Sequence, residues 1–196
     1  LTSIEIPENV TSIEGYLFED CSNLESVKIP ESIASIDKGA FYECQSLTSI
    51  NIPKDVTRIE NYTFYGCINL DIEIPDNITY IGYGAFDRCG FTNIVIPASV
   101  TYIASHAFSF CRNSADITFV GAAPEFGGDV FYGVTTTVYY PANDSSWTEE
   151  IRQDYGGHIT WVAKEYEPEE TELKILVQPE NVTGEIGDTA TFAVEA

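Results

Sequence analysis

The sequence predicts a β-rich solenoid with parallel strands, short helical turns and a C-terminal cap. Three observations lead to this prediction. One unit recurs along residues 1–113, each copy contains two apolar residues two positions apart followed by proline, and each copy ends with a phenylalanine three residues before a cysteine. Because a single unit of this kind cannot bury its own apolar side chains, the copies are expected to stack on one another.

The repeat has five regular copies of the pattern L-x-x-I-x-I-P-x-x-V-x-x-I-x-x-x-A-F-x-x-C. The fourth copy lacks one residue near its start and another at its end. The copies begin at intervals of 23, 23, 23 and 21 residues, at Leu1, Leu24, Leu47, Leu70 and Phe91.

The I-x-I segment predicts a short strand in each copy. A spacing of two directs both branched side chains to the same face, and the proline that follows removes a backbone donor and ends the strand. The inward columns of this strand are Ile4, Val27, Ile50, Ile72 and Ile94, followed by Ile6, Ile29, Ile52, Ile74 and Ile96.

The rest of each copy returns the chain along the other sides of the coil. V-x-x-I adds two further apolar columns, and A-F-x-x-C has the spacing of one helical turn. Parallel strands of neighbouring copies would lie ~4.8 Å apart. The aromatic column that this stacking would produce consists of Phe18, Phe41, Phe64, Phe86 and Phe108.

This pattern resembles the BspA-like (Treponema pallidum type) leucine-rich repeat, closely over residues 1–113 and more loosely to residue 163. Residues 114–163 would then hold a degenerate unit and a cap that covers the open end of the core. Within the cap we expect a strand before Pro141, a helix from Ser146 to Gly156, and a last strand in HITWVA.

Two further segments follow the predicted solenoid of residues 1–163. Residues 164–173 are acidic, contain proline and are poor in apolar residues, which indicates a linker. Residues 174–196 alternate like two strands and resemble the start of a bacterial immunoglobulin-like domain, truncated here because a whole sandwich needs roughly 100 residues.

The composition excludes several classes of partner. The formal net charge is −22, which argues against nucleic acid and against an anionic membrane surface. No run of apolar residues is long enough for direct membrane insertion as a helix. Leu1 already lies inside a repeat, so we expect the sequence to be a piece of a longer protein.

The sequence offers no candidate catalytic, cofactor-binding or metal-binding residues. All five cysteines occupy the same repeat position, which favours inert, buried thiols over a metal site or a disulfide framework. His106 and His158 have no cysteine or carboxylate at a recognisable ligand spacing. No nucleophile or phosphate-binding motif is present, so we expect no enzyme activity and no cofactor.

The outward positions of the strands are the candidate ligand-facing residues. A solenoid offers such columns as an extended face, although a merely solvated face has the same pattern. Tyr80 and Tyr102 form an outward column of the second side. They would either bind a sugar or a peptide side chain or stabilise the sheet as a cross-strand pair. The candidates on the first strand are Glu5, Lys28, Asn51, Glu73 and Asn93.

The family resemblance implies a function that the residues alone do not. Relatives with such repeats are associated with adhesion, so we expect a non-enzymatic binding module on a bacterial cell surface. Its partner would be a host extracellular protein, a glycan or another bacterium, and the sequence carries no signal of an oligomeric state. The alternative hypothesis is an accessory or spacer module of a larger secreted enzyme.

Overall fold

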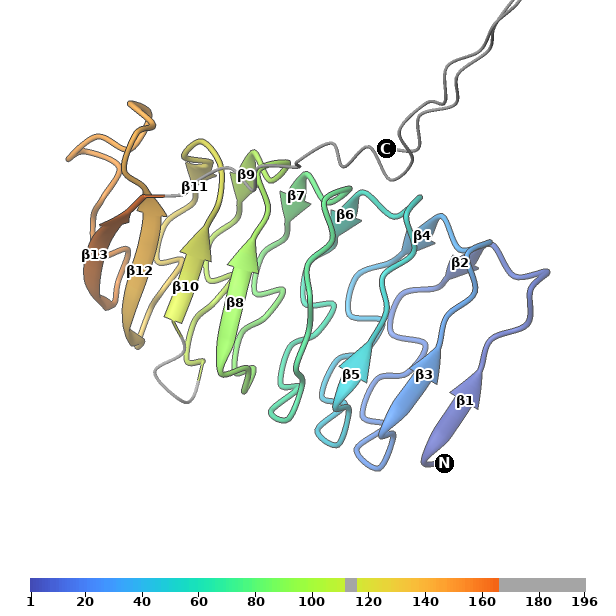
Figure 1. The fold of residues 1–196 in the computed structure, drawn as a ribbon. Helices are drawn as coiled ribbons and strands as arrows, with labels where there is room; N and C mark the ends of the chain where they lie inside the picture. Colours follow the sequence, from blue (N-terminus) through green and yellow to red (C-terminus); the bar gives the residue numbers. More distant parts are fainter. Residues whose placement is uncertain (112–115, 166–196) are drawn as a thin grey trace, which may run out of the picture. The chain divides into compact units, whose positions relative to one another are not determined.

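The structure, a computed structural model, describes residues 1–111 and 116–165 of the chain. The chain divides into two compact units, Leu1–Tyr166 and Glu167–Ala196. The described residues of the first unit form a stack of coils in which every strand pairing is parallel (Figure 1). The predicted solenoid is therefore confirmed.

The first side of the coil carries the longer strands. They form two sheets, in the orders β1-β3-β5 and β13-β12-β10-β8. Partners lie in repeat register, because Ile4 pairs with Val27 and Val27 with Ile50. The strands are β1 (Ser3–Glu5), β3 (Ser26–Lys28), β5 (Ser49–Ile50), β8 (Asn93–Ile96), β10 (Asp116–Phe119), β12 (Thr135–Pro141) and β13 (His158–Lys164).

The second side of the coil carries strands of two residues each. They also form two sheets, in the orders β2-β4 and β11-β9-β7-β6, again with neighbouring copies paired in parallel. Figure 1 shows this row behind the longer strands along the same stack. The strands are β2 (Ser12–Ile13), β4 (Ser35–Ile36), β6 (Arg58–Ile59), β7 (Tyr80–Ile81), β9 (Tyr102–Ile103) and β11 (Glu125–Phe126).

A column of stacked phenylalanine rings runs through the core. Neighbouring rings lie 5.3, 5.7, 5.5, 5.5 and 6.1 Å apart between centroids and are nearly parallel. Each ring covers the next, so a copy in the middle of the stack depends on both neighbours for its apolar contacts. The column consists of Phe18, Phe41, Phe64, Phe86, Phe108 and Phe131.

The A-F-x-x-C segments are turns, and the predicted helical turns are wrong. Leu17 donates its backbone N–H to Glu14 three residues back, whereas Phe18 donates to Ala40 of the next copy. Backbone N–H groups thus donate alternately to a carbonyl of the same turn and to a carbonyl of the next copy, so the i to i−4 hydrogen bonds of a helix do not form. Each turn also has two left-handed residues four positions apart, as at Tyr16 and Asp20.

The shortened fourth copy interrupts the first side. Residues 71–75 form no strand, and this gap separates the sheet that ends at β5 from the sheet that begins at β8. Ile72 and Ile74 nevertheless stay buried, and the N–H of Asp71 still donates to Thr48. The missing residue therefore removes strand pairing while the core column continues.

The cap consists of two strands and an aromatic cluster. β12 and β13 confirm the two predicted strands, but residues 142–157 contain no helix, so the helix predicted from Ser146 is wrong. Ser146 instead accepts a hydrogen bond from the N–H of Ala123 and donates to Asp144. The cluster that closes the core contains Phe119, Phe126, Phe131, Tyr140, Trp147, Tyr155 and Trp161.

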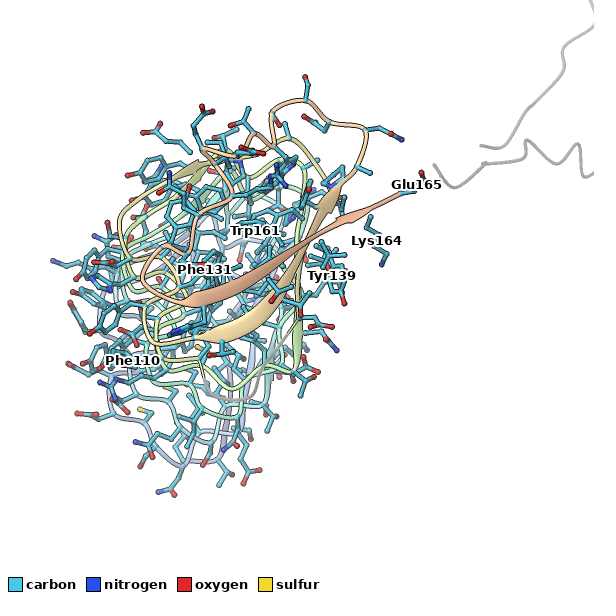
Figure 2. All side chains as sticks on the ribbon, turned by 90° about the vertical axis from the view of Figure 1, so that its left-hand side faces the viewer. Phe110, Phe131, Tyr139, Trp161, Lys164 and Glu165 are labelled. Carbon is cyan, nitrogen blue, oxygen red and sulfur yellow. The ribbon has the colours of Figure 1, made fainter. Side chains whose placement is uncertain are left out.

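Figure 2 looks at this end of the solenoid, with β12 and β13 across the front and Trp161 and Phe131 against the interior. β13 ends at Lys164, the first residue of the predicted linker. The rest of that linker beyond Glu165 and the predicted immunoglobulin-like segment lie outside the described residues. Among residues 1–111 and 116–165, no helix has the length and apolar character needed to cross a membrane.

Candidate functional site

Four of the five predicted ligand-facing residues of the first side lie along one shallow hollow. Its volume is about 830 Å³, and its walls include Glu5, Lys28, Asn51 and Glu73. Lys28 and Glu5 face each other from paired strands, with 2.6 Å between Nζ and Oε1. The hydrogen bond from Lys28 to Glu5 raises the pKa of this lysine. Both side chains are highly exposed, so the pair contributes little to stability.

Asn51 has a structural role within this face. Its Nδ2 donates to the carbonyl of Ile29 at 3.0 Å, and its Oδ1 accepts from the N–H of the same residue at 3.4 Å. The side chain therefore continues the strand pairing beyond the end of β5. Asn93 lies on β8, on the other side of the gap in the sheet, beside an exposed Val95.

Tyr80 and Tyr102 lie on the second side of the coil, apart from the other five candidates. Their rings stack in parallel at 5.5 Å from β7 and β9, which are paired strands. The Arg58 guanidinium lies 3.7 Å from the centre of the Tyr80 ring, and its Nε is 2.7 Å from Glu60. The outer ring face is therefore already occupied by a cation of the chain, as in a stabilising cross-strand column.

A second hollow lies over the turns, where the sequence analysis placed no candidate. Its volume is about 650 Å³ and its walls come from the first four copies of the repeat. We name this hollow the tyrosine groove. It is lined by Tyr16, Tyr42, Tyr62, Tyr65 and Tyr83 together with Glu19 and Asp87.

The rings of the tyrosine groove pack mainly against one another. Tyr42 and Tyr65 stack in parallel at 4.6 Å, and Tyr62 stands edge-on to Tyr65 at 6.0 Å and to Tyr83 at 5.2 Å. Tyr16 lies 6.4 Å from Tyr42 and closes the row. The rings remain partly or largely exposed, so they form a surface in addition to the phenylalanine core.

The left-handed turns place these rings. Gly39 and Gly84 have φ of +63° and +58°, and a Cβ on Gly39 would lie 2.2 Å from the Tyr16 ring. On Gly84 it would lie 2.9 Å from the Tyr62 ring. Tyr16 and Tyr62 thus alternate with glycines at one turn position, and each of these two rings lies against the glycine of the next copy.

Carboxylates give the tyrosine groove a negative character. Burial raises the pKa of Asp87 to about 6, while Arg88 and His106 act in the opposite direction. The Oδ1 atom of Asp87 is buried without a hydrogen bond, and Arg88 Nε is 3.9 Å away. Burial also raises the pKa of Tyr42, and Tyr65, Glu43 and Glu19 add to the effect.

The aromatic surface continues beyond the tyrosine groove. His106 stands edge-on to Tyr83 at 5.4 Å and to Tyr132 at 6.0 Å, and Tyr132 contacts Phe110 at 5.3 Å. We call the groove and these three residues the aromatic turn face. In Figure 2, Phe110 lies on the opposite side of the coil from Tyr139 of β12, so this face is distinct from the strand face.

The cysteines form a ladder of free thiols beside the phenylalanine column. Cys44 donates through Sγ to the carbonyl of Phe18 in the preceding copy at 3.1 Å, and Cys67 and Cys89 do the same one and two copies further on. Burial raises the pKa of Cys44 to about 12 and those of the next thiols well above 9. Thiols held in the protonated form are poor nucleophiles and poor metal ligands.

No group of three or more metal-ligating side chains is found among residues 1–111 and 116–165. The aromatic turn face was missed in the sequence because A-F-x-x-C was interpreted as a core motif alone. The signal that could have revealed it is the tyrosine directly after phenylalanine in two consecutive copies, Phe41-Tyr42 and Phe64-Tyr65.

The chain belongs to the BspA type leucine-rich repeat family. The model of the BspA type leucine rich repeat region matches in six copies, over residues 1–113 and 35–150. This match covers more than half of the chain and includes the degenerate sixth unit. No curated protein matches the chain.

Three solved bacterial structures share the fold. A leucine-rich repeat protein from Bacteroides ovatus is 31% identical, and the match covers 72% of this chain and 40% of the Bacteroides chain with a TM-score of 0.66. A leucine rich cell surface protein from Faecalibacterium prausnitzii is 36% identical, and the match covers 62% of this chain and 32% of that protein with a TM-score of 0.55. The Treponema pallidum leucine rich repeat protein is 30% identical, and the match covers 67% of this chain and 63% of that protein with a TM-score of 0.61.

The matched regions span less than two thirds of each of these three proteins. The comparisons place the chain in a family of surface-type leucine-rich repeat proteins, a class that generally binds proteins or mediates adhesion. The sequence-based resemblance to this family is confirmed, and the Faecalibacterium relative is a cell surface protein.

Proposed function

We propose that this chain is a non-enzymatic binding module at a bacterial cell surface that attaches to a host extracellular protein, a glycan or another bacterium. The family and the cell-surface relative support the location. The buried thiols support a role without covalent chemistry, because burial raises the pKa of Cys44, Cys67 and Cys89 and so favours their unreactive, protonated form.

The observation that carries the proposal is the aromatic turn face. A spacer needs only a solvated exterior, whereas this face keeps large rings in water: Tyr132 is 45% exposed and Phe110 41%. Aromatic residues are enriched at binding surfaces because they bury a large area at a small entropic cost. The face runs across consecutive copies, as an extended ligand would require.

The proposal is tested with the complete 196-residue chain immobilised on beads. The beads are presented to purified extracellular-matrix proteins, to mucins, to a glycan array and to cells of co-resident bacteria. We expect saturable binding to at least one member of this panel, and the absence of binding to every member would refute the proposal.

Variants then show which face is used. The Tyr80→Ala, Tyr102→Ala double variant tests the second side, and charge reversal at Glu5 and Glu73 tests the strand face. We expect both to retain binding, because the first pair already holds Arg58 and the second lies in a sheet hollow without aromatic rings. Loss of binding in the charge-reversed variant would assign the ligand to the strand face instead.

A further inference from the structure

The tyrosine groove combines ring walls with carboxylates, which is the chemistry that recognises organic cations. Glu19 and Asp87 lie in its walls among five tyrosine rings. Asp87 also has a buried oxygen without a hydrogen bond, and its nearest cationic atom is 3.9 Å away. The carboxylate that a ligand in the groove can reach directly is therefore the exposed Glu19, and Asp87 adds negative charge from within the wall.

The groove already attracts the chain's own cations at its margins. Lys38 Nζ lies 5.9 Å from the centre of the Tyr16 ring. The Arg88 guanidinium lies 5.9 Å from the Tyr65 ring and 5.1 Å from the Phe110 ring. The accessible ring faces are thus oriented so that a positive group can approach them, whereas Tyr42 and Tyr65 cover each other's inner faces and leave less flat surface for a sugar ring.

The dimensions of the groove indicate the shape of the ligand. Its rings come from four consecutive copies, from Tyr16 to Tyr83, and three intervals of ~4.8 Å give a length of roughly 14 Å. An extended chain of about four residues has this length. Side chains at alternate positions of such a chain point the same way, so alternate cationic residues would face the rings together.

From this juxtaposition we infer that the tyrosine groove binds an extended, basic polypeptide segment with arginine or lysine at alternate positions. The inference rests on the proposed binding function and specifies its partner as a cationic protein segment. The formal net charge of −22 draws such a segment toward the molecule, and the groove gives the attraction a specific site.

The test measures binding of a fluorescent heptapeptide with arginine at alternate positions and glycine between them. Fluorescence anisotropy gives its Kd for the complete chain at physiological salt, beside peptides with lysine or glutamate in place of arginine. We expect the arginine and lysine peptides to bind and the glutamate peptide not to bind. A neutral β-linked hexasaccharide, added as competitor, should not displace the peptide.

Two groove variants and two matched controls separate the site from general charge attraction. Tyr42→Ala with Tyr65→Ala should raise the Kd about tenfold, while the stacked pair Tyr80→Ala with Tyr102→Ala should leave it within about twofold. Glu19→Lys should also raise the Kd about tenfold, because its cation competes for the rings. Glu8→Lys changes net charge equally outside the groove and should have a much smaller effect.

Circular dichroism checks that each variant is folded. If the tyrosine double variant does not fold, Glu19→Lys still tests the site, because Glu19 is exposed and its replacement should not disturb the core. Equal losses in Glu19→Lys and Glu8→Lys would overturn the inference, because binding would then follow net charge alone. No peptide binding, or displacement by the hexasaccharide, would also overturn it. Continued binding to the matrix panel in those cases would leave the proposed function standing.

Discussion

The phenylalanine column predicts a specific dependence of stability on position in the stack. Phe64 is 1% exposed and stacks on Phe41 at 5.7 Å and on Phe86 at 5.5 Å. A buried phenylalanine removes ~150–250 Å² from water, and truncation to alanine also leaves a cavity. We therefore expect Phe64→Ala to lower the free energy of unfolding by about 4 kcal/mol.

Phe18→Ala is the matched control for this prediction. Phe18 is 7% exposed and, among the residues that the structure describes, stacks on one ring only, Phe41 at 5.3 Å. Because one stacked partner contributes about 1 kcal/mol beyond burial, the control should lower the free energy of unfolding by about 3 kcal/mol. The difference between the two variants isolates the contribution of stacking between copies.

Urea titration supplies the measurement, with two probes. Circular dichroism reports on the whole solenoid, whereas fluorescence reports on Trp147 and Trp161, the only tryptophans, which both lie in the cap. In Phe64→Ala the two transitions should separate, because the central copy no longer couples its neighbours. A loss below about 1 kcal/mol, or an equal loss in Phe18→Ala, would refute the role assigned to the column.

Three further predictions follow from the structure. Cys67 should resist thiol reagents in the folded chain and react only on unfolding, since burial raises its pKa and its Sγ donates to Phe41; rapid labelling of the native protein would contradict this. Gly39→Ala should lower the free energy of unfolding by about 2–3 kcal/mol in thermal melts, because φ is +63° and the new Cβ, 2.2 Å from the Tyr16 ring, would force that ring to shift. Gly128→Ala, with no contact closer than 3.9 Å, should change it by less than about 0.5 kcal/mol, and equal losses in the two variants would contradict this. Burial raises the pKa of Asp87 from 3.8 to about 6, so the folded state holds this proton more tightly than the unfolded chain, and the free energy of unfolding should fall as pH rises between these values. Asp87→Asn should flatten that part of the stability profile and, after allowance for partial exposure, add about 1 kcal/mol to the free energy of unfolding at pH 7.5. An unchanged profile would count against this assignment.

The core could be predicted from the sequence because periodicity records burial directly. An apolar residue recurring at the same repeat position must find an apolar neighbour, and in a stack that neighbour is its own copy one turn away. The columns of Ile4 and Phe18 and the shared cysteine position all follow from this reasoning, and the structure places them as expected. The two cap strands followed in the same way from short apolar runs.

The turns could not be predicted with the same rule. The spacing A-F-x-x-C fits a helical turn and a left-handed turn equally well, because both return side chains to one face after three or four residues. The choice depends on where the N–H groups donate, and Phe18 donates to Ala40 of the next copy. The helix predicted after Ser146 was wrong for a related reason. The Ser146 hydroxyl accepts from the N–H of Ala123 in the preceding coil and donates to Asp144, instead of capping the N–H groups that follow it.

The candidate sites also divide into features that the repeat pattern predicts and features that depend on contacts between copies. The outward positions of Glu5 and Lys28 were predictable from strand alternation, but their mutual ion pair depends on the register of two strands. The tyrosine groove was not predictable as a site, because its rings occupy several repeat positions and meet only in the stack, where left-handed turns place Tyr16 and Tyr62 against glycines of the next copy.

The sequence by itself determined the stacked coil, its buried columns and the sign of its surface charge, since these depend on residue type and spacing within one unit. Only the tertiary structure decided the turn conformation, the break in the first sheet and the gathering of tyrosines with Glu19 and Asp87. The physical reason is that a backbone hydrogen bond or a ring contact between copies is a property of two units at once, and a pattern within one unit specifies only half of it.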